Sequence, residues 1–299
     1  MNSKISNFDQ ICSLRRYTLT EGEGGGLDVI DCDNGKLRFL LNVSCALDMM
    51  QLYCEGTNLS FISKNGFNAC KGPFSRRFEG GMLYTCGLDS VGDRRGFEVH
   101  GSLHQTPARV TAMRSDEDGI TVEAEVRSSA LFGEHLVLKR RFFTPVMGDF
   151  VTLKDTLVNA GHTSADYCLL YHVNVGYPLL DEGAKLEING DCTPRTPWAA
   201  ENVSLVREVI APEPGREETC YFWQLHEPRV TVINEGLGRS LTLSYTGDTL
   251  PHFIEWQSMA SGDYALGLEP ATTVLDSGFA YKQLAPAAKV CFGLCWKAK

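Results

Sequence analysis

The 299-residue sequence lacks any apolar run close to the roughly eighteen residues that a membrane-spanning helix needs. The N-terminal segment, residues 1–17, lacks the apolar stretch of a secretory signal peptide. There is also no internal repeat, no low-complexity linker and no block of like charge. We therefore expect a cytoplasmic protein that does not contact a membrane.

Clustered positive charge is missing as well. The formal net charge is -9 and the isoelectric point is near 5.3, whereas phosphate backbones are bound by grouped Lys and Arg side chains. The basic pairs are scattered, and we expect them on the solvated surface; they are Arg15-Arg16, Arg76-Arg77, Arg94-Arg95 and Arg140-Arg141. Nucleic acid is excluded as a partner on this evidence.

The cysteine pattern offers no metal or disulfide framework. Eleven cysteines are spread over a long chain without a Cys-x-x-Cys motif, so free thiols are expected. Four of them lie in apolar runs typical of strands and are predicted core residues, namely Cys168, Cys220, Cys291 and Cys295. The glycine-rich residues 22–26 lack the lysine and following helix of a phosphate-binding loop, and we expect an ordinary loop there.

What the sequence does contain is alternation of apolar and polar residues rich in β-branched and aromatic side chains. The predicted strands include residues 37–43, 119–126, 135–143, 150–158, 229–234, 240–245 and 288–296. Turn sequences such as Asp118-Gly119 separate them. Only residues 43–53 and 197–202 are predicted as short helices. We expect an all-β, mostly antiparallel sandwich in which residues 1–299 form a single domain.

Polar residues interrupt the strand pattern at three places, where a β scaffold usually presents a site. Residues 74–108 bring arginines, histidines and glycines together in short connections. In residues 170–180, alternation places His172 and Asn174 on one face of an extended segment. Glu269 ends an apolar strand and is followed by a proline. Each feature alone has an ordinary structural explanation, but together an imidazole and a carboxylate can form an acid and base pair.

These motifs resemble the galactose mutarotase, or aldose 1-epimerase, superfamily, and within it a branch of uncharacterised bacterial proteins. The resemblance rests on His100-Gly101, on the His segment in residues 171–178 and on residues 253–257 with 267–270, in the family's order. It covers residues 37–296. It implies a galactose-mutarotase-like β-supersandwich with few short helices, no metal and no organic cofactor.

The resemblance also implies roles for individual residues. Glu269 corresponds to the general base on the anomeric hydroxyl, and protonated His172 to the acid that donates to the ring oxygen. The remaining expected residues bind the substrate: His100, Arg76 or Arg77, Asn174, Glu218 and Gln257.

Two departures from the family pattern concern substrate contacts. The segment before His100 reads Ser75-Arg-Arg-Phe-Glu-Gly-Gly-Met82, so the binding arginine can be either Arg76 or Arg77. The additional His104 and Arg95 suit an acidic or sulfonated sugar, although a solvated surface position is the simpler interpretation of each.

The functional hypothesis is an isomerase that interconverts the α and β anomers of a free or modified sugar. One alternative is another acid and base reaction on an acidic, sulfonated or oxidised sugar in the same cleft. The other is a sugar-binding or sensor protein without catalysis, because a fold alone does not decide function. The predicted partner is a small-molecule sugar, and the sequence does not indicate an oligomeric state.

Overall fold

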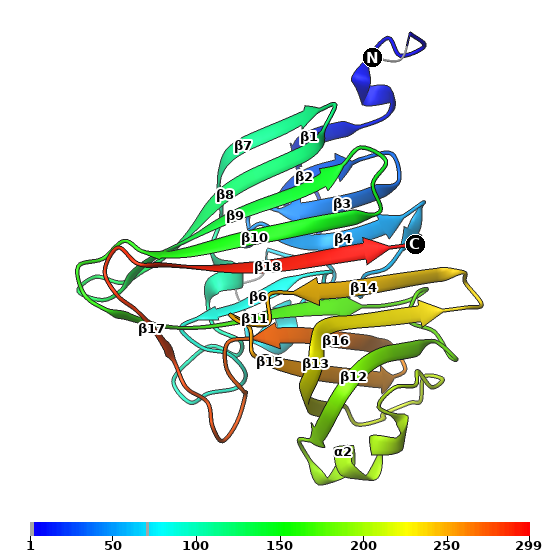
Figure 1. Cartoon of the computed structure of the whole chain (residues 1–299), viewed down its shortest axis with the longest axis vertical. Coiled ribbons are helices and arrows are strands. Elements are labelled where there is room, and N and C mark those ends of the chain that lie inside the picture. Colours follow the sequence, from blue (N-terminus) through cyan, green and yellow to red (C-terminus); the bar gives the residue numbers. More distant parts are fainter. Residues whose placement is uncertain (1–2, 70–71) are drawn as a thin grey trace.

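The computed structural model describes residues 3–69 and 72–299, and most of them lie in antiparallel β-sheets (Figure 1). The first sheet has five strands that follow one another in chain order. They are β1 (Ser13–Thr18), β2 (Asp28–Asp33), β3 (Leu37–Asn42), β4 (Asp48–Cys54) and β5 (Thr57–Asn58). The chain therefore begins with a simple meander.

The remaining strands form one sheet with the order β17-β11-β16-β15-β13-β14-β18-β10-β9-β8-β7, in which β6 also pairs with β11 and β12 with β13. In chain order, its earlier strands are β6 (Tyr84–Leu88), β7 (Arg109–Asp116), β8 (Gly119–Ser129), β9 (His135–Pro145), β10 (Phe150–Asn159) and β11 (Ala165–Val175). Its later strands are β12 (Lys185–Pro194), β13 (Thr219–Asn234), β14 (Arg239–Tyr245), β15 (His252–Ala260), β16 (Asp263–Ala271), β17 (Lys282–Leu284) and β18 (Lys289–Ala298).

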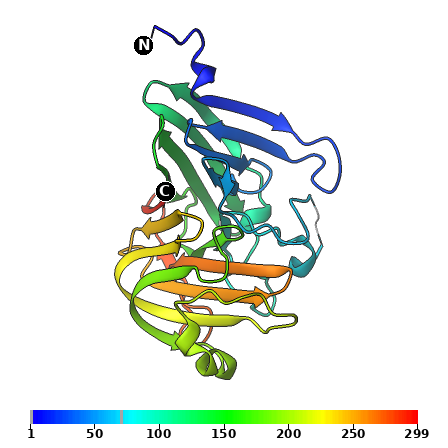
Figure 2. The same cartoon turned by 90° about the vertical axis from the view of Figure 1, so that its right-hand side faces the viewer.

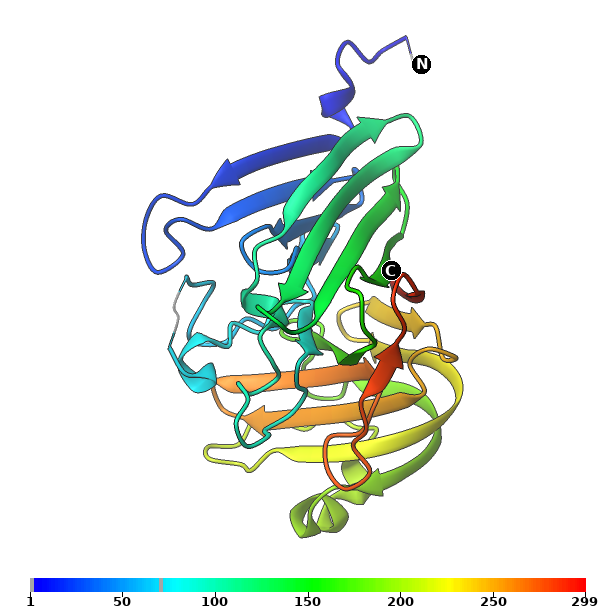
Figure 3. The same ribbon diagram turned by 90° about the vertical axis from the view of Figure 1, so that its left-hand side faces the viewer.

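The meander lies against the β7–β10 half of the large sheet, and the β11–β16 half extends beyond it (Figures 2 and 3). Between the two sheets, Phe39 of β3 and Phe142 of β9 are both fully buried, and their ring centroids lie 6.4 Å apart. The main hydrophobic cluster draws its residues from both sheets. The predicted all-β, mostly antiparallel sandwich is thus confirmed.

A charged cluster is buried between the sheets, which the sequence did not predict. Arg140 of β9 is 1 % exposed; its guanidinium donates to Asp155 of β10 at 3.1 Å and to Asp48 of β4 at 2.7 Å. The Nδ1 atom of His104 lies 2.7 Å from the second oxygen of Asp48. The expected surface positions of Arg140 and His104 are therefore wrong, because both side chains neutralise carboxylates inside the sandwich.

Helices are few and short. They are α1 (Phe74–Arg77), α2 (Pro197–Glu201) and the 3-10 turns η1 (Phe8–Gln10), η2 (Leu103–Gln105) and η3 (Val203–Leu205). The prediction at 197–202 is confirmed by α2, whose Thr196 side chain caps it. The helix expected at 43–53 is wrong: Ala46 and Leu47 have positive φ in a turn, and β4 follows. No helix among the described residues is long and apolar enough to cross a bilayer.

The cysteines mostly match expectation. Those that the structure describes are free thiols, and Cys70 lies outside the described residues. Cys168 and Cys220 are buried, as predicted. Cys291 is exposed and Cys295 half-buried, because on β18 they point away from the buried face that carries Phe292, Leu294 and Trp296.

Candidate active site

A cavity of about 640 Å³ lies over strands β11, β15 and β16 of the large sheet. Its walls come from α1 and from loops that are distant in sequence. Its polar or charged lining residues are Ser63, Lys64, Asn65, Ser75, Asp93, His100, His172, Arg195, Arg216, Glu218, Ser258, Asp263 and Glu269. The mixture of aromatic and polar groups in a cavity of this size suits a small polar ligand.

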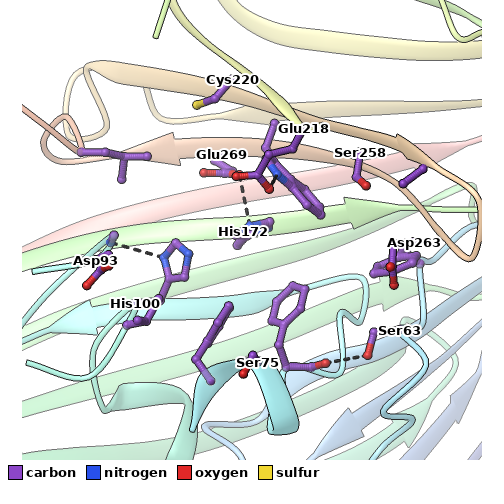
Figure 4. Close-up of a pocket in the computed structure, with 18 of the residues that line it drawn as sticks. Ser63, Ser75, Asp93, His100, His172, Glu218, Cys220, Ser258, Asp263 and Glu269 are labelled. Atoms are coloured by element: carbon purple, nitrogen blue, oxygen red, sulfur yellow. Dashed lines mark hydrogen bonds and ion pairs between the residues drawn. The ribbon is translucent and has the colours of Figure 1, made fainter. Parts of the chain in front are cut away.

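His172 and Glu269 form a pair in this cavity. His172 lies on β11 and Glu269 on the neighbouring β16, where Val173 is opposite Leu268. The His172 Nε2 atom is 3.2 Å from Glu269 Oε1, and the side chains point toward one another (Figure 4). The residues are only 5 % and 2 % exposed, so the pair is held by the sheet and largely shielded from water.

The surroundings change the proton affinity of both groups. Burial raises the pKa of Glu269 to about 8, and Arg195 opposes this shift while Glu218 adds to it. Burial lowers the pKa of His172 well below its ordinary value, and the nearby His100 lowers it further. Both shifts favour the uncharged forms of the two groups, in which the pair holds one proton, on the carboxyl group.

His100 lies beside this pair on the loop that precedes η2. It has a φ of 62°, and the backbone N–H of Gly92 donates to its Nδ1 atom at 3.4 Å (Figure 4). Its ring meets that of His172 edge-on, with centroids 5.5 Å apart. Burial and the positive charges of Arg195 and Arg77 lower its pKa to about 4, so His100 is a neutral hydrogen-bonding group.

Aromatic rings form the apolar part of the wall. Trp256 of β15 and Phe78 pack against His172 with ring centroids 5.6 Å and 5.7 Å away. The indole N–H of Trp256 donates to Glu218 at 2.7 Å, which orients that carboxylate at the cavity. Such rings can pack on the apolar face of a sugar while carboxylates accept its hydroxyl hydrogens.

Of the predicted site residues, the structure brings His100, His172, Glu218 and Glu269 together in the cavity. Asn174 is fully buried behind it, where its Nδ2 donates to the carbonyl oxygens of Gly81 and His172. It acts on the pair through His172, because its side chain favours the protonated ring and so counteracts part of the fall in the pKa of His172.

The other predicted contacts lie elsewhere. Gln257 faces the opposite side of β15 from Trp256 and Ser258, and its Nε2 donates to the carbonyl of Val206 and to Glu255. Arg77 is buried against Tyr84 and Glu98 and lines a separate cavity.

Arg76, next to Arg77 in α1, is exposed and outside the main cavity. Strand alternation and the α1 turn therefore direct the predicted binding residues Gln257, Arg76 and Arg77 away from the cavity.

Arg195 is a cavity residue that sequence reasoning missed. It follows β12, and its backbone N–H donates to the carbonyl of Cys220 at the start of β13. Its only signal in the sequence was its position after a strand-ending proline. Trp256 was also missed, although it adjoins Gln257 in residues 253–257, because it is Trp256 whose side of β15 faces the cavity.

No group of three or more His, Cys, Asp or Glu side chains within the described residues is arranged to hold a metal ion. The cavity residues are instead hydrogen-bonding groups around one shared proton. That arrangement can move protons to and from a bound hydroxyl compound.

The fold is that of the galactose mutarotase-like β-sandwich proteins. A "putative aldose 1-epimerase" from Klebsiella pneumoniae superposes with a TM-score of 0.86 at 18% identity, over 96% of this chain and 83% of that one. A galactose mutarotase-like protein from Clostridium acetobutylicum gives 0.74 at 13% identity, over 97% and 99%. Another from Lactobacillus casei gives 0.63 at 14%, over 91% and 100%.

The sequence itself matches one family, described as a domain of unknown function (DUF4432), over residues 24–285. The chain belongs to this family. No curated protein matches it.

Proposed function

We propose that the protein is an aldose 1-epimerase that interconverts the α and β anomers of a sugar. The observation that supports this most directly is the buried pair at 3.2 Å between His172 Nε2 and Glu269 Oε1, beside an open cavity large enough for a monosaccharide. The names of the similar structures point to the same chemistry.

The reaction needs two simultaneous proton transfers. Glu269, as a carboxylate, removes the proton from the anomeric hydroxyl, and protonated His172 donates a proton to the ring oxygen. The bond between the anomeric carbon and the ring oxygen breaks, and the electron pair of the O–H bond forms the aldehyde. The aldehyde rotates about its bond to the next carbon, and the reverse transfers close the other anomer.

The proton count of the free pair suits this reaction. A protonated Glu269 with a neutral His172 carries the same single proton as a Glu269 carboxylate with an imidazolium. The short contact lets that proton move from one group to the other when a sugar binds, without exchange with solvent. His100 is placed to donate to or accept from an oxygen of the ring, because it is neutral and lines the same cavity.

Anomer exchange tests the proposal directly. Saturation transfer between the α and β signals of free sugars, measured by NMR, should increase in proportion to added enzyme. Glu269→Gln and His172→Gln should each reduce this rate by about 10²-fold or more, since each removes one proton-transfer group.

Glu255→Gln is the matched control. Glu255 is also buried on β15, with its pKa raised to about 8 by burial, but it faces Trp223 and Gln257 on the other side of the sheet. Its replacement should leave the exchange rate near that of the wild type. Sugar binding without exchange would favour a sensor, and a new product would favour a different acid and base reaction.

A further inference from the structure

The cavity contains three cations, and each already has a carboxylate partner. Lys64 pairs with Asp263 at 2.7 Å on the rim, where both side chains are well exposed. Arg216 donates to Glu213 and to the amide oxygen of Asn202, each at 2.7 Å. These two side chains have their main donors occupied by protein groups.

Arg195 differs in which donors it uses. Its Nε and Nη2 atoms donate side-on to the two oxygens of Asp276 at 2.7 Å and 2.8 Å. A guanidinium has five N–H donors, and Asp276 takes two of them. The Cys220 thiol, which also lines the cavity, is a further hydrogen-bond partner of the Arg195 side chain, but a thiol is a weak acceptor that a hydroxyl can displace. The side chain is 33 % exposed and lines the cavity.

Arg195 is also the cavity cation that acts on the reacting groups. Its positive charge opposes the burial-driven rise in the pKa of Glu269, and it contributes to the lowered pKa of His100. Neither Lys64 nor Arg216 has such an effect on these two groups. Arg195 and Glu269 both line the same cavity, so a ligand bound there can contact both side chains.

We propose that Arg195 is the specificity-determining residue of this site: its edge away from Asp276 donates to two adjacent hydroxyls of the sugar, and Asp276 cancels its charge so that the site does not select a carboxylate. The proposal rests on the proposed function. The planar edge of a guanidinium offers two parallel donors, which fits two neighbouring oxygens. Nearby Glu218 and Asp93 add negative charge to the cavity and disfavour an anionic sugar.

The experiment compares matched pairs of neutral aldoses and their uronic acids, with exchange followed by NMR and binding followed by the ligand-induced rise in Tm. Wild type should act on the neutral member of a pair at least tenfold more efficiently. Arg195→Gln should raise KM for the neutral sugar about tenfold with a smaller change in kcat. Arg195→Lys should not restore KM, because an ammonium group lacks the planar pair of donors.

Asp276→Asn tests the role of charge. It leaves Arg195 positive without a counter-charge, so the ratio of uronate to aldose kcat/KM should rise about tenfold. The control is Asp31→Asn, which breaks a side-on pair of the same geometry between Arg38 and Asp31 in the first sheet, outside the cavity. Asp31→Asn should leave the ratio of uronate to aldose kcat/KM unchanged.

The outcomes separate this proposal from the proposed function. If anomers exchange but Arg195→Gln leaves KM unchanged, or if wild type prefers the uronates, the role of Arg195 is overturned and the epimerase proposal stands. If sugars bind without exchange, the epimerase proposal fails, and the same variants test Arg195 through binding. If no neutral sugar binds or reacts, both proposals fall.

Discussion

At the scale of single residues, the candidate site contains a carboxyl group and an imidazole whose pKa values are shifted in opposite directions. Burial gives Glu269 a pKa of about 8 and takes the pKa of His172 well below its ordinary value. The usual order of a carboxyl and an imidazole is therefore reversed in the free protein. As a result, one proton stays in the pair across the whole neutral range.

This order predicts an asymmetric pH dependence of kcat/KM. Above about pH 8 the pair loses its only proton and has no acid, so kcat/KM should fall about tenfold per pH unit. Below pH 8 the rate should stay flat through pH 6.5, because His172 accepts a second proton only at much lower pH. The measurement is the exchange rate between pH 5 and 9.5, corrected for the uncatalysed reaction. A loss of activity centred at pH 6.5 would contradict this proton order.

At the scale of elements, three neighbouring strands hold the pair in place. Gly267 of β16 lies opposite Asn174 of β11 and Trp256 of β15. A Cβ atom at Gly267 would lie 2.7 Å from Glu269 Oε1 and 3.1 Å from His172 Cε1. The absence of a side chain at this position therefore gives the acid and base pair its space.

Gly267→Ala should consequently damage catalysis more than folding. The added methyl group displaces both reacting side chains, and kcat should fall by about 10-fold to 10²-fold. Overpacking should cost about 1–3 kcal/mol of unfolding free energy. The control is Gly293→Ala on β18, where the nearest atom to the new Cβ is Thr246 Oγ1 at 3.3 Å. Equal losses of kcat in both variants would show that Gly267 has no special relation to the pair.

The elements also show what the sequence could and could not predict. Alternation was sufficient for β8, β9 and β10, because their apolar side chains on one face point toward the core. Alternation does not show which polar face borders a cavity and which borders another layer. For that reason Gln257 was expected in the cavity, where the structure has its neighbour Trp256 together with His172 and Glu269. Arg195 depends on loop geometry, for which the sequence carries little signal.

At the scale of the whole molecule, the two sheets are joined by a buried charged cluster as well as by apolar packing. Arg140 contacts Asp155 in one sheet and Asp48 in the other, and the Tyr171 hydroxyl donates to Asp155 at 2.8 Å. Alternation along β9 places Arg140 on the face of the buried Leu138 and Phe142 and Arg141 on the other face. The sequence did not show the partners of Arg140, because Asp48 comes from the other sheet.

Replacing these two arginines should therefore have very different effects. Arg140→Met leaves the buried Asp155 without a cation and Asp48 with His104 alone, and it should cost about 3–5 kcal/mol of unfolding free energy. Arg141→Met removes a half-exposed side chain paired with Glu123 and should cost less than about 1 kcal/mol. Urea unfolding measures both. If Arg140→Met does not fold, Arg140→Lys should fold with an intermediate loss, and similar stability of all three variants would contradict this role.

The division between strands and loops around the cavity has a consequence for how such a protein can diversify. The acid and base pair lies on adjacent paired strands, where any shift of register would disrupt the sheet. Arg195, Asp276 and His100 lie on connections whose length and composition can change without that penalty. The proposed proton-transfer pair and the proposed Arg195 contact thus lie in separate parts of the chain. Under the proposed function, loop replacement can change the sugar while the same proton transfers are kept.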